Sequence, residues 1–506
     1  MRFGSSCDFK EIHVSTLPAC YIFPELTKVP MSCCEDVHLV FLPSAGMGHL
    51  NPCLRTASLF LRNGCKVTLV TPKNTVSQAE TNLISRFCSS FPHQVTSVDL
   101  NLVPVDPKTV QTKDPFWLQF ETIRRSVHLL APILSSLSPP PSAFVFDVSL
   151  ISPLLPIIQN FSFPSYIYFV SPARMLSLFA HLPVLDASNP GADSHPCSFI
   201  GDFVKIPGIE SPILRSSIPP LLLEPNTLFE KIFMEDSPKL KNLNGILINS
   251  FEEIEGEALA ALNEGKVVEG LPPVYGVGPL MAGEYEKVDE GEGSGCMGSI
   301  LEWLDKQGEG SVVYVCMGNR TATRKEQIKD IALGLIECGY SFLWVVKLKV
   351  VDKEEEEDLE EVLGSELMKK VKEKGMVVKE YVDQRKILGH PGVGGFVNHG
   401  GWNSIMEAVW EGVPMLLWAN DGDQKIASQA VGIIGVGIWA EEWGWGSRQV
   451  VNGKAIAKRI NDMMSNHSLR IKAAHVKEAA RRAAATSHLI VQTLIHHWNK
   501  GNAPPT

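Results

Sequence analysis

Short apolar runs alternate along most of this chain with longer segments in which apolar and polar residues are mixed. The first run, Val37–Pro43, is apolar apart from His38, as expected for a strand buried on both faces of a parallel sheet. A helix is predicted over Pro52–Asn63, because Asn51 stands at an N-cap position and Pro52 at the first helical position. Later strands of this half are predicted over Lys66–Thr71, Phe144–Asp147 and Ser165–Val170.

A second series of the same kind occupies the other half of the chain. A helix over Lys325–Cys338 separates strands predicted over Val312–Met317 and Phe342–Lys347. Further strands are predicted over Val377–Lys379, Val393–Asn398 and Pro414–Trp418. Between the two series, the apolar run Val274–Met281 is followed by a Gly- and Glu-rich stretch of linker composition, Gly283–Gly295. Two sets of β-α units predict an α/β fold of two doubly wound, Rossmann-like domains facing a cleft.

The domain boundaries are predicted where this pattern breaks. Residues 1–30 contain no apolar run of signal-peptide length, and we expect a disordered extension there; a natural start at Met31 and a genuine N-terminal tail both stay open. The other predicted parts are an N-terminal domain at 31–275, a linker at 276–296, a C-terminal domain at 297–485, and a C-terminal helix and tail at 486–506. That helix, over about Ser487–Asn499, could return to either domain. The apolar stretch Leu150–Val170 contains prolines and predicts strand, turn and strand rather than a membrane span.

The composition of the chain indicates which kinds of partner and which cellular compartment to expect. The chain has 506 residues, of which 44% are hydrophobic and 20% charged, as is ordinary for a folded protein. Its formal net charge of -10 disfavours nucleic acid as a partner, because phosphate binding requires a basic face. The 11 cysteines include no C-x-x-C pair, so no zinc or thioredoxin-like motif is indicated, and reduced thiols favour the cytoplasm. We expect a monomer without an integral membrane segment.

One strand of the second half leads into a turn with phosphate-binding chemistry. After the strand Val393–Asn398 comes the turn His399–Gly401, and a helix begins near Asn403. Backbone N–H groups at a helix start, together with the helix dipole, attract phosphate. The side chains of Asn403, Ser404 and His399 add hydrogen-bond donors. A glycine turn alone also serves tight packing, so the prediction rests on the whole combination.

The 44-residue stretch from Tyr381 to Gln424 resembles, without a gap, the signature box of plant secondary-product UDP-glycosyltransferases. The resemblance extends over nearly the whole chain from about Val37, and it is looser in the N-terminal half. It implies the two-domain arrangement called GT-B, with an acceptor-binding domain at 31–275 and a UDP-sugar-binding domain at 297–485. It also implies UDP-glucose as a co-substrate, a small phenolic acceptor and no cofactor. Gln424 at the end of the box favours glucose over galactose.

The resemblance also implies a role for each matching residue. These are Tyr381 stacking on uracil, Gln384 bonding the uridine, Glu407 holding the ribose diol, His399, Asn403 and Ser404 holding the pyrophosphate, and Trp402, Asp423 and Gln424 holding the hexose hydroxyls. The loop after the strand at Val312–Met317 resembles a second phosphate contact through Gly318 and Asn319. Taken alone, Trp402 could equally be a core residue, and the pair Asp423-Gln424 a surface turn.

Four positions differ from the usual residues of this family. Tyr381 replaces Trp, Gly400 replaces Cys, Ala419 replaces Pro and Asn319 replaces Ser. Tyrosine in place of tryptophan should weaken stacking on uracil without abolishing it. These changes bear on the affinity for the donor and leave the predicted fold unchanged.

His49 stands in SAGMGHLNP, at the carboxyl end of the first strand, where α/β sheets bind ligands. It matches the family's general base, and Asp147, which ends a later strand, matches the acidic partner of that base. A phenol has a pKa near 10 and must lose its proton as it attacks, and a histidine near neutrality can accept that proton. UDP can leave as an anion held by the phosphate site, so no metal is implied, although Asp421 and Asp423 could in principle hold one. Attack opposite UDP should invert the anomeric centre.

Within the family, three stretches resemble the plant C-glycosyltransferases of flavonoid pathways: Ser341–Lys347, Gly375–Gln384 and Ile438–Gly446. They imply transfer to a ring carbon of a 2-hydroxyflavanone or dihydrochalcone. An O-glucosyltransferase acting on a flavonoid or other phenol is the first alternative, and a catalytically weak UDP-sugar-binding protein is the second. An oxidoreductase is disfavoured, because the G-x-G of SAGMGHLNP lacks the third glycine of a dinucleotide-binding fingerprint.

Overall fold

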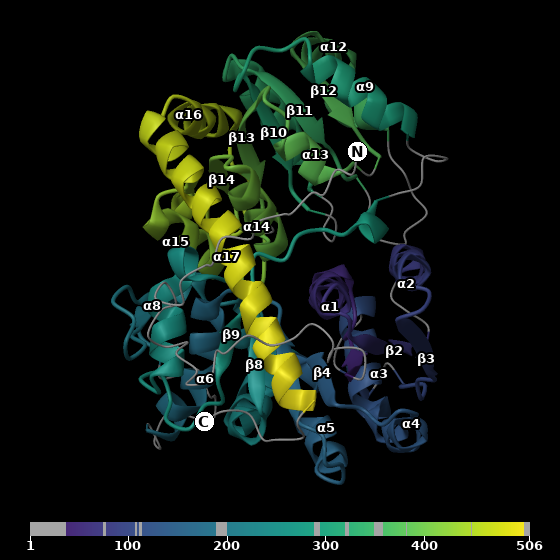
Figure 1. Ribbon diagram of the computed structural model, residues 1–506. Coiled ribbons are helices and arrows are strands. Elements are labelled where there is room, and N and C mark those ends of the chain that lie inside the picture. The colour runs from purple at the N-terminus through teal and green to yellow at the C-terminus, as the bar shows by residue number, and fades with distance from the viewer. Residues whose placement is uncertain are drawn as a thin grey trace, which may run out of the picture.

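The computed structural model describes residues 37–73, 77–106, 109–110, 114–188, 200–287, 294–318, 323–348, 358–380, 382–446 and 448–499. Within these ranges the chain forms two parallel β-sheets covered by helices, and a two-stranded antiparallel ribbon of β6 (Phe203–Val204) and β7 (Ile213–Leu214) (Figure 1). The predicted α/β fold with two doubly wound sheets is confirmed. The predicted extension at residues 1–30 lies outside the described residues.

The first sheet contains seven parallel strands in the order β3-β2-β1-β4-β5-β8-β9. Its strands are β1 (His38–Leu42), β2 (Lys66–Pro72), β3 (Val95–Leu100), β4 (Ala143–Asp147), β5 (Ser165–Phe169), β8 (Gly245–Ile248) and β9 (Val274–Gly276). Its helices are α1 (Met47–Leu61), α2 (Gln78–Ser90), α3 (Pro115–Ser126), α4 (Leu130–Ser136), α5 (Ile151–Ile158), α6 (Ala173–Ala187), α7 (Leu228–Asp236) and α8 (Glu252–Asn263). The strand order reverses between β1 and β4, and such a switch point is where α/β sheets bind ligands.

The second sheet contains six parallel strands in the order β12-β11-β10-β13-β14-β15. Its strands are β10 (Val312–Cys316), β11 (Ser341–Val345), β12 (Gly375–Val378), β13 (Val393–Asn398), β14 (Met415–Leu417) and β15 (Gly437–Trp439). The helices of this half are α9 (Ser294–Leu304), α10 (Lys325–Glu337), α11 (Leu359–Leu363), α12 (Ser365–Lys374), α13 (Gln384–Leu388), α14 (Trp402–Glu411), α15 (Gln424–Ile434), α16 (Gly453–Met464) and α17 (His467–Asn499). Here the switch point lies between β10 and β13.

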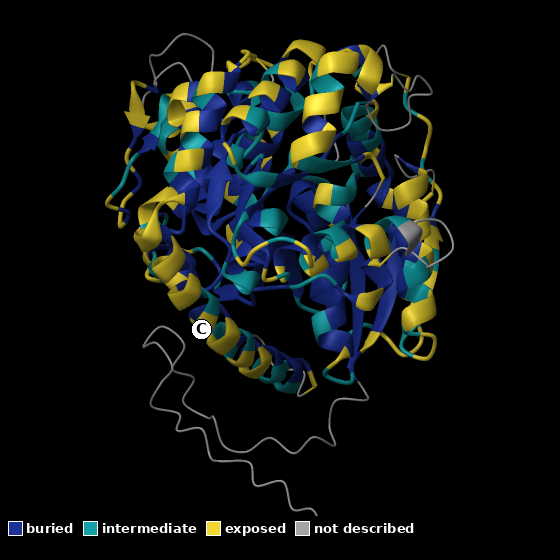
Figure 2. Cartoon of the chain, turned by 90° about the horizontal axis from the view of Figure 1, so that it is seen from above, coloured by how far each residue is buried: buried dark blue, intermediate teal, exposed yellow. Residues whose placement is uncertain are grey.

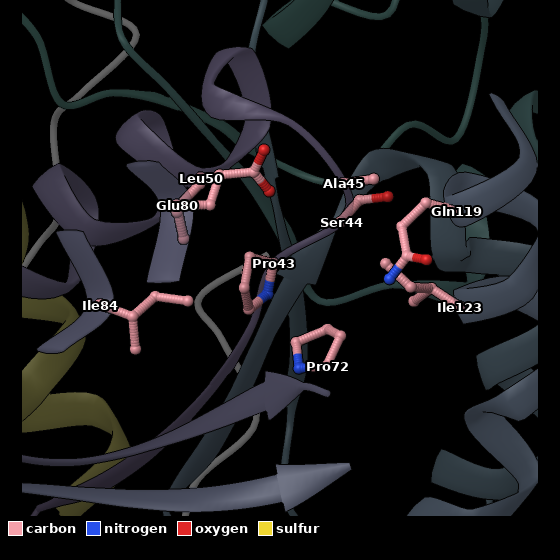
Figure 3. Close-up of a pocket in the computed structure, with 9 residues that line it drawn as sticks. All are labelled: Pro43, Ser44, Ala45, Leu50, Pro72, Glu80, Ile84, Gln119 and Ile123. Carbon is pink, nitrogen blue, oxygen red and sulfur yellow. The ribbon is translucent and has the colours of Figure 1, made fainter. Parts of the chain in front are cut away.

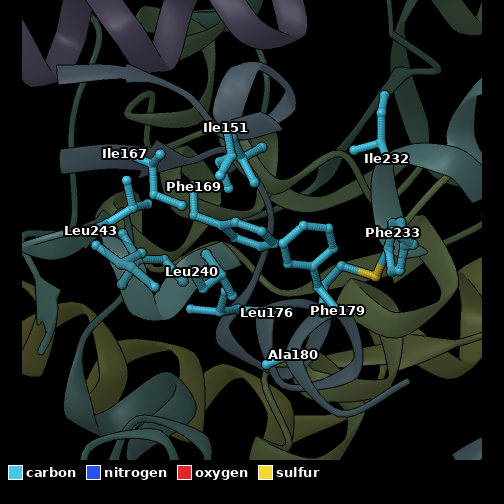
Figure 4. Packing of buried hydrophobic residues seen from close by; sticks show 14 of the residues in the cluster. Ile151, Ile167, Phe169, Leu176, Phe179, Ala180, Ile232, Phe233, Leu240 and Leu243 are labelled. Atoms are coloured by element: carbon cyan, nitrogen blue, oxygen red, sulfur yellow. The ribbon is translucent and has the colours of Figure 1, made fainter. Parts of the chain in front are cut away.

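Both faces of each sheet are buried, which explains why the strands are continuous apolar runs. In β4, Phe144 and Phe146 belong to one hydrophobic cluster, and the intervening Val145 belongs to another. Figure 4 shows part of the first cluster, in which Ile167 and Phe169 of β5 pack among side chains of the covering helices. Buried strands lie inside and exposed residues follow the outer helices (Figure 2).

Helix α17 joins the two halves of the molecule. The sequence predicted a final helix from about Ser487, and this was too short, because the helix begins at His467 and runs for 33 residues. Its first part packs in the core of the second sheet through Val476 and its last part in the core of the first sheet through Leu494. The helix therefore crosses from one half to the other (Figure 1). Its Ala-, Lys- and Arg-rich beginning favours helix but has few apolar residues to signal it.

One further local prediction is corrected. The stretch Leu150–Val170, predicted as strand, turn and strand, forms helix α5 followed by strand β5, with Pro156 inside the helix. At the start of the segment predicted as a linker, Val277 and Leu280 are buried. Gly278 packs closely there, since a Cβ on it would lie 2.6 Å from the backbone of Ser250. Within the described ranges, no helix is long and apolar enough to cross a membrane.

Candidate active site

His49 lies in the first turn of helix α1, directly after β1. The sequence predicted that this helix begins at Pro52, and this was wrong, because it begins at Met47 and contains Pro52. The cause is Gly46, whose φ of 87° turns the chain from β1 straight into the helix. A Cβ on Gly46 would lie 2.6 Å from the ring of Phe116, so the close approach also requires glycine. The helix start therefore fixes His49 at the switch point of the first sheet.

The neighbouring strand supplies a carboxylate to this histidine. Nδ1 of His49 lies 2.7 Å from Oδ2 of Asp147, the last residue of β4. Asp147 is fully buried, and its Oδ1 accepts hydrogen bonds from the backbone N–H (2.9 Å) and hydroxyl (2.5 Å) of Ser149. Burial raises the pKa of Asp147, but the charge and hydrogen bond of His49, with those from Ser149, outweigh burial and hold the pKa below its usual value. An ionised Asp147 requires a proton on Nδ1, which leaves Nε2 of His49 as a base.

Aromatic rings of helix α3 flank this base. The ring of Phe120 lies 5.3 Å from the ring of His49, and that of Phe116 lies 6.2 Å away. A pocket opens beside them, between α2 and α3 at the ends of β1 and β2 (Figure 3), lined by Pro43, Ser44, Ala45, Leu50, Pro72, Glu80, Ile84, Gln119 and Ile123. Glu80 accepts a 3.3 Å hydrogen bond from the N–H of Gly46, which ties the pocket to the turn before His49.

The switch point of the second sheet holds the predicted phosphate residues. Gly318 follows β10, and His399 follows β13 just before α14. The ring of His399 lies against two glycines, since a Cβ on Gly318 would lie 2.7 Å from it and a Cβ on Gly401 2.5 Å. Nδ1 of His399 and Oδ1 of Asn403 are buried without a hydrogen-bond partner among the described residues. Burial lowers the pKa of His399 to about 4, so the ring is neutral at pH 7. The ring of His399 and the backbone N–H groups at the start of this ten-residue helix can donate to an anionic ligand, whereas Oδ1 of Asn403 accepts and suits a hydroxyl.

The side chains expected at the uridine lie together on α13 and α14. Nε2 of Gln384 donates to Oγ of Ser404 at 3.1 Å and to Oε2 of Glu407 at 2.8 Å. Oε1 of Glu407 accepts from the guanidinium of Arg55, which belongs to helix α1 of the other half, at 2.8 Å. The side chain of Glu407 is 8% exposed. The site thus presents a fixed, charge-paired carboxylate beside the phosphate residues.

The indole of Trp402 is buried between the two halves of the molecule. Its N–H donates to the backbone carbonyl of Asn249 at 2.7 Å, and the residue is only 4% exposed. A contact between Trp402 and a hexose would therefore have to come from its backbone at the start of α14. The contact of Trp402 with a hexose stays a prediction.

Asp423 is the N-cap of α15, and Gln424 is the first residue of that helix. Burial raises the pKa of Asp423, while a hydrogen bond from Ser171 and the charge of His49 lower it in part. Oε1 of Gln424 accepts from the backbone N–H groups of Asn420 (2.8 Å) and Asp421 (3.0 Å). These two hydrogen bonds hold the turn that leads into α15.

Some predicted residues cannot be placed, and others were missed. Asn319 and Tyr381 lie outside the described residues, so their contacts stay predictions. Sequence reasoning missed Ser149, although a short polar residue two positions after a strand-ending aspartate is a recognisable capping pattern. It also missed Arg55, whose partners stand 231 and 352 residues away, beyond any local signal. Within the described ranges, no group of three His, Cys, Asp or Glu residues could hold a metal.

Gly400, which replaces the family's usual cysteine, has a φ of 80°. A Cβ at this position would lie 2.7 Å from Oγ of Ser428. That hydroxyl donates to the backbone carbonyl of Gln424 at 2.6 Å. The glycine thus fits both the left-handed backbone and the serine that packs on it.

Two Rossmann-like sheets, with a histidine–aspartate pair at one switch point and a buried histidine before a helix start at the other, are the arrangement expected of a nucleotide-sugar-dependent transferase of the GT-B type. Comparison with known proteins agrees. Residues 297–475 match the family described as UDP-glucoronosyl and UDP-glucosyl transferase. The chain is 66% identical over 470 residues to UDP-glycosyltransferase 708D1 of Glycine max, covering 92% of this chain and 98% of that protein.

Two further relatives extend the comparison. UDP-glycosyltransferase CGT of Oryza sativa subsp. indica is 41% identical over 451 residues, covering 88% of this chain and 92% of that protein. The crystal structure of LpCGTa in complex with UDP is 38% identical and superposes with a TM-score of 0.77, covering 91% of this chain and 99% of that one. The chain belongs to the UDP-glycosyltransferase family, as the box from Tyr381 to Gln424 predicted.

Proposed function

We propose that this UDP-glycosyltransferase moves glucose from UDP-glucose to a ring carbon of a flavonoid-type polyphenol, such as a 2-hydroxyflavanone or a dihydrochalcone. The observation that carries the proposal is the position of His49. The base is oriented by buried Asp147 and flanked by the rings of Phe116 and Phe120. The choice of carbon is supported by the resemblance to flavonoid C-glycosyltransferases and agrees with relatives whose names contain CGT.

In the proposed reaction, Nε2 of His49 accepts the proton of an acceptor phenol. The negative charge is shared with the ring carbon between two meta hydroxyls, and this carbon attacks the anomeric carbon as the bond from that carbon to UDP breaks. The attacking ring carbon then loses its proton, and the carbonyl oxygen formed from the phenolate takes one up, which restores the aromatic phenol. Asp147 stabilises the imidazolium, and the cradle around His399 receives the charge of the departing UDP. Attack from the side opposite UDP gives an inverted centre.

The attached atom is tested by acid hydrolysis of the product formed from UDP-glucose and phloretin or a 2-hydroxyflavanone. A C–C bond survives acid, whereas an O-glycoside releases glucose and the parent phenol. We expect a hydrolysis-resistant product, with NMR placing glucose on the ring carbon. Complete release of glucose from every accepted phenol would leave the O-glucosyltransferase, because near-attack placement differing by about 1 Å decides between the two nucleophiles.

A catalytically weak UDP-sugar-binding protein is the second alternative, and the unusual residues Tyr381, Asn319 and Ala419 are its motivation. The intact pair His49–Asp147 favours an active enzyme. Release of UDP in the presence of acceptor distinguishes the two. The expected monomer and the cytoplasmic location stay predictions, which sedimentation and cell fractionation would test.

A further inference from the structure

Arg55 is a buried charge that the reaction described above does not use. It lies on helix α1, six residues after His49, and its side chain is only 3% exposed. Its Nε and one terminal nitrogen donate to the two carboxylate oxygens of Glu286 at 2.9 and 2.7 Å. The same terminal nitrogen donates to Oε1 of Glu407 at 2.8 Å. A guanidinium buried this deeply persists because two carboxylates pair with it.

The three residues come from three separate parts of the molecule. Arg55 belongs to the helix that carries the base, and Glu407 to helix α14 of the second half. Glu286 belongs to the segment that crosses between them, and its Oε1 also accepts from the backbone N–H of Gly283 at 3.0 Å. One guanidinium thus ties the base-bearing helix, the crossing segment and the donor side together.

Glu407 keeps room for a ligand within this arrangement. Its Oε1 faces Arg55, and its Oε2 accepts from Gln384 at 2.8 Å. Each carboxylate oxygen can accept two hydrogen bonds, so each has a further lone pair for a hydroxyl. Two vicinal hydroxyls match a carboxylate that is held in this orientation.

We propose that Arg55 is a positioning residue for the nucleotide. It orients Glu407 toward the two ribose hydroxyls of UDP and couples that carboxylate to the helix that carries His49. The inference rests on the proposed use of UDP-glucose and on Glu407 as the ribose contact. Arg55 touches neither the sugar nor the acceptor, so its effect should appear in nucleotide affinity and in the KM for UDP-glucose.

The test compares UDP with 2′,3′-dideoxy-UDP, which lacks both ribose hydroxyls, by titration calorimetry on the full chain. We expect Arg55→Gln to weaken UDP binding about tenfold, as for a lost charge-assisted hydrogen bond, and dideoxy-UDP binding less than twofold. The KM for UDP-glucose should rise by a similar factor, with kcat within about twofold. Arg62→Gln, an exposed position just after the same helix, removes the same charge and should change neither affinity.

Arg55→Gln leaves two buried carboxylates unpaired and can prevent folding. Arg55→Lys keeps the charge but not the forked guanidinium that reaches both carboxylates. It should therefore also weaken the binding of UDP more than the binding of dideoxy-UDP. Equal losses for both nucleotides, or no loss in Arg55→Lys, would overturn the proposal, as would a wild type that binds both nucleotides equally. Failure of the wild type to bind UDP or transfer glucose would instead refute the proposed function.

Discussion

On the base side of the site, Asp147 accepts three hydrogen bonds, one from His49 and two from Ser149, and is fully buried. On the donor side, Nδ1 of His399 and Oδ1 of Asn403 are buried without a partner among the described residues. A buried polar atom without a partner costs about 1–3 kcal/mol. The pair His49–Asp147 is therefore already hydrogen-bonded, whereas the ring of His399 keeps a hydrogen-bonding nitrogen that no described residue uses and that a ligand could meet.

This difference follows the two tasks. A base must hold one tautomer before the acceptor arrives, because its proton acceptor, Nε2 of His49, is defined by the bond at Nδ1. A phosphate cradle gains affinity when a ligand satisfies groups that are already desolvated and fixed. Substitutions on the base side should therefore reduce kcat, and substitutions on the donor side should reduce affinity.

The largest expected effect comes from His49→Ala. Transfer should fall by about 10²–10⁴-fold, as when a general base is removed. The affinity for UDP should stay unchanged, because the cradle lies on the other sheet. Activity is measured as product formed per enzyme and affinity by calorimetry, with His93→Ala as the control at an exposed histidine. Near-normal turnover of His49→Ala would show that another group removes the proton.

The second effect separates the two histidines by pH. Since burial lowers the pKa of His399 to about 4, the empty site holds a neutral ring, and a bound pyrophosphate should raise that pKa. UDP binding should then take up a proton, and affinity should rise between pH 7 and pH 5. In His399→Gln we expect binding about tenfold weaker at pH 7, with this proton uptake lost. Calorimetry in buffers of different ionisation enthalpy measures it, and the difference between the proteins removes the titration of UDP itself.

The same shift has a consequence for stability. The folded pKa of His399 lies below the ordinary value of 6.5, so below that pH the unfolded chain binds a proton that the empty folded site does not. Wild-type stability should fall from pH 6.5 toward pH 4 through this group, and His399→Gln should lack that part of the loss. Parallel pH profiles of the two proteins in thermal melts would contradict the low pKa.

The same division explains what the sequence could predict. The residues predicted for the donor side are nearly contiguous in the chain, because most of them lie in the box from Tyr381 to Gln424. One sequence motif was therefore enough to predict them together. The pairing of His49 with Asp147 was also predictable, because His49 follows the first strand, Asp147 ends β4, and the carboxyl ends of parallel strands share an edge. The role of Arg55 could not be predicted, because it depends on contacts with Glu286 and Glu407. These residues are distant in the sequence and come near Arg55 only when the two halves pack together.

The errors in the fold have a similar origin. Asn51 and Pro52 form a strong local signal for a helix start, but the positive φ of Gly46 and its contact with Phe116 start the helix earlier. Here the packing around Gly46 outweighed the local preference of Asn51 and Pro52 for a helix start. The beginning of α17 was missed for the opposite reason, since its helix-forming residues carry few apolar positions to mark a period.

A smaller effect is expected at the turn before α15. Asp423→Ala or Gln424→Ala should raise the KM for UDP-glucose about tenfold and leave the KM for the acceptor nearly unchanged, because each truncation leaves a sugar hydroxyl unpartnered. Gln424→Ala should also loosen the turn that its Oε1 holds at Asn420 and Asp421. Steady-state kinetics with UDP-glucose and UDP-galactose test both the site and the sugar. An effect confined to the acceptor, or tighter use of UDP-galactose, would contradict this assignment.

The smallest expected effect is that of removing metal ions. Proteins that transfer phosphorylated sugars with a metal use it to offset the charge of the leaving pyrophosphate. Here we expect the backbone N–H groups at the start of α14, with His399 beside them, to meet that charge. Asp421 uses one carboxylate oxygen to accept from the N–H of Gly422 at 2.8 Å, and Asp423 is the N-cap of α15. Transfer measured after dialysis against EDTA should match that of untreated enzyme, and added Mg²⁺ or Mn²⁺ should change it less than twofold. A loss of activity that one of these ions restores would mean that the residues around His399 do not stabilise the leaving UDP without a metal. The donor side would then depend on a metal as well as on its ligand, whereas His49 depends only on Asp147.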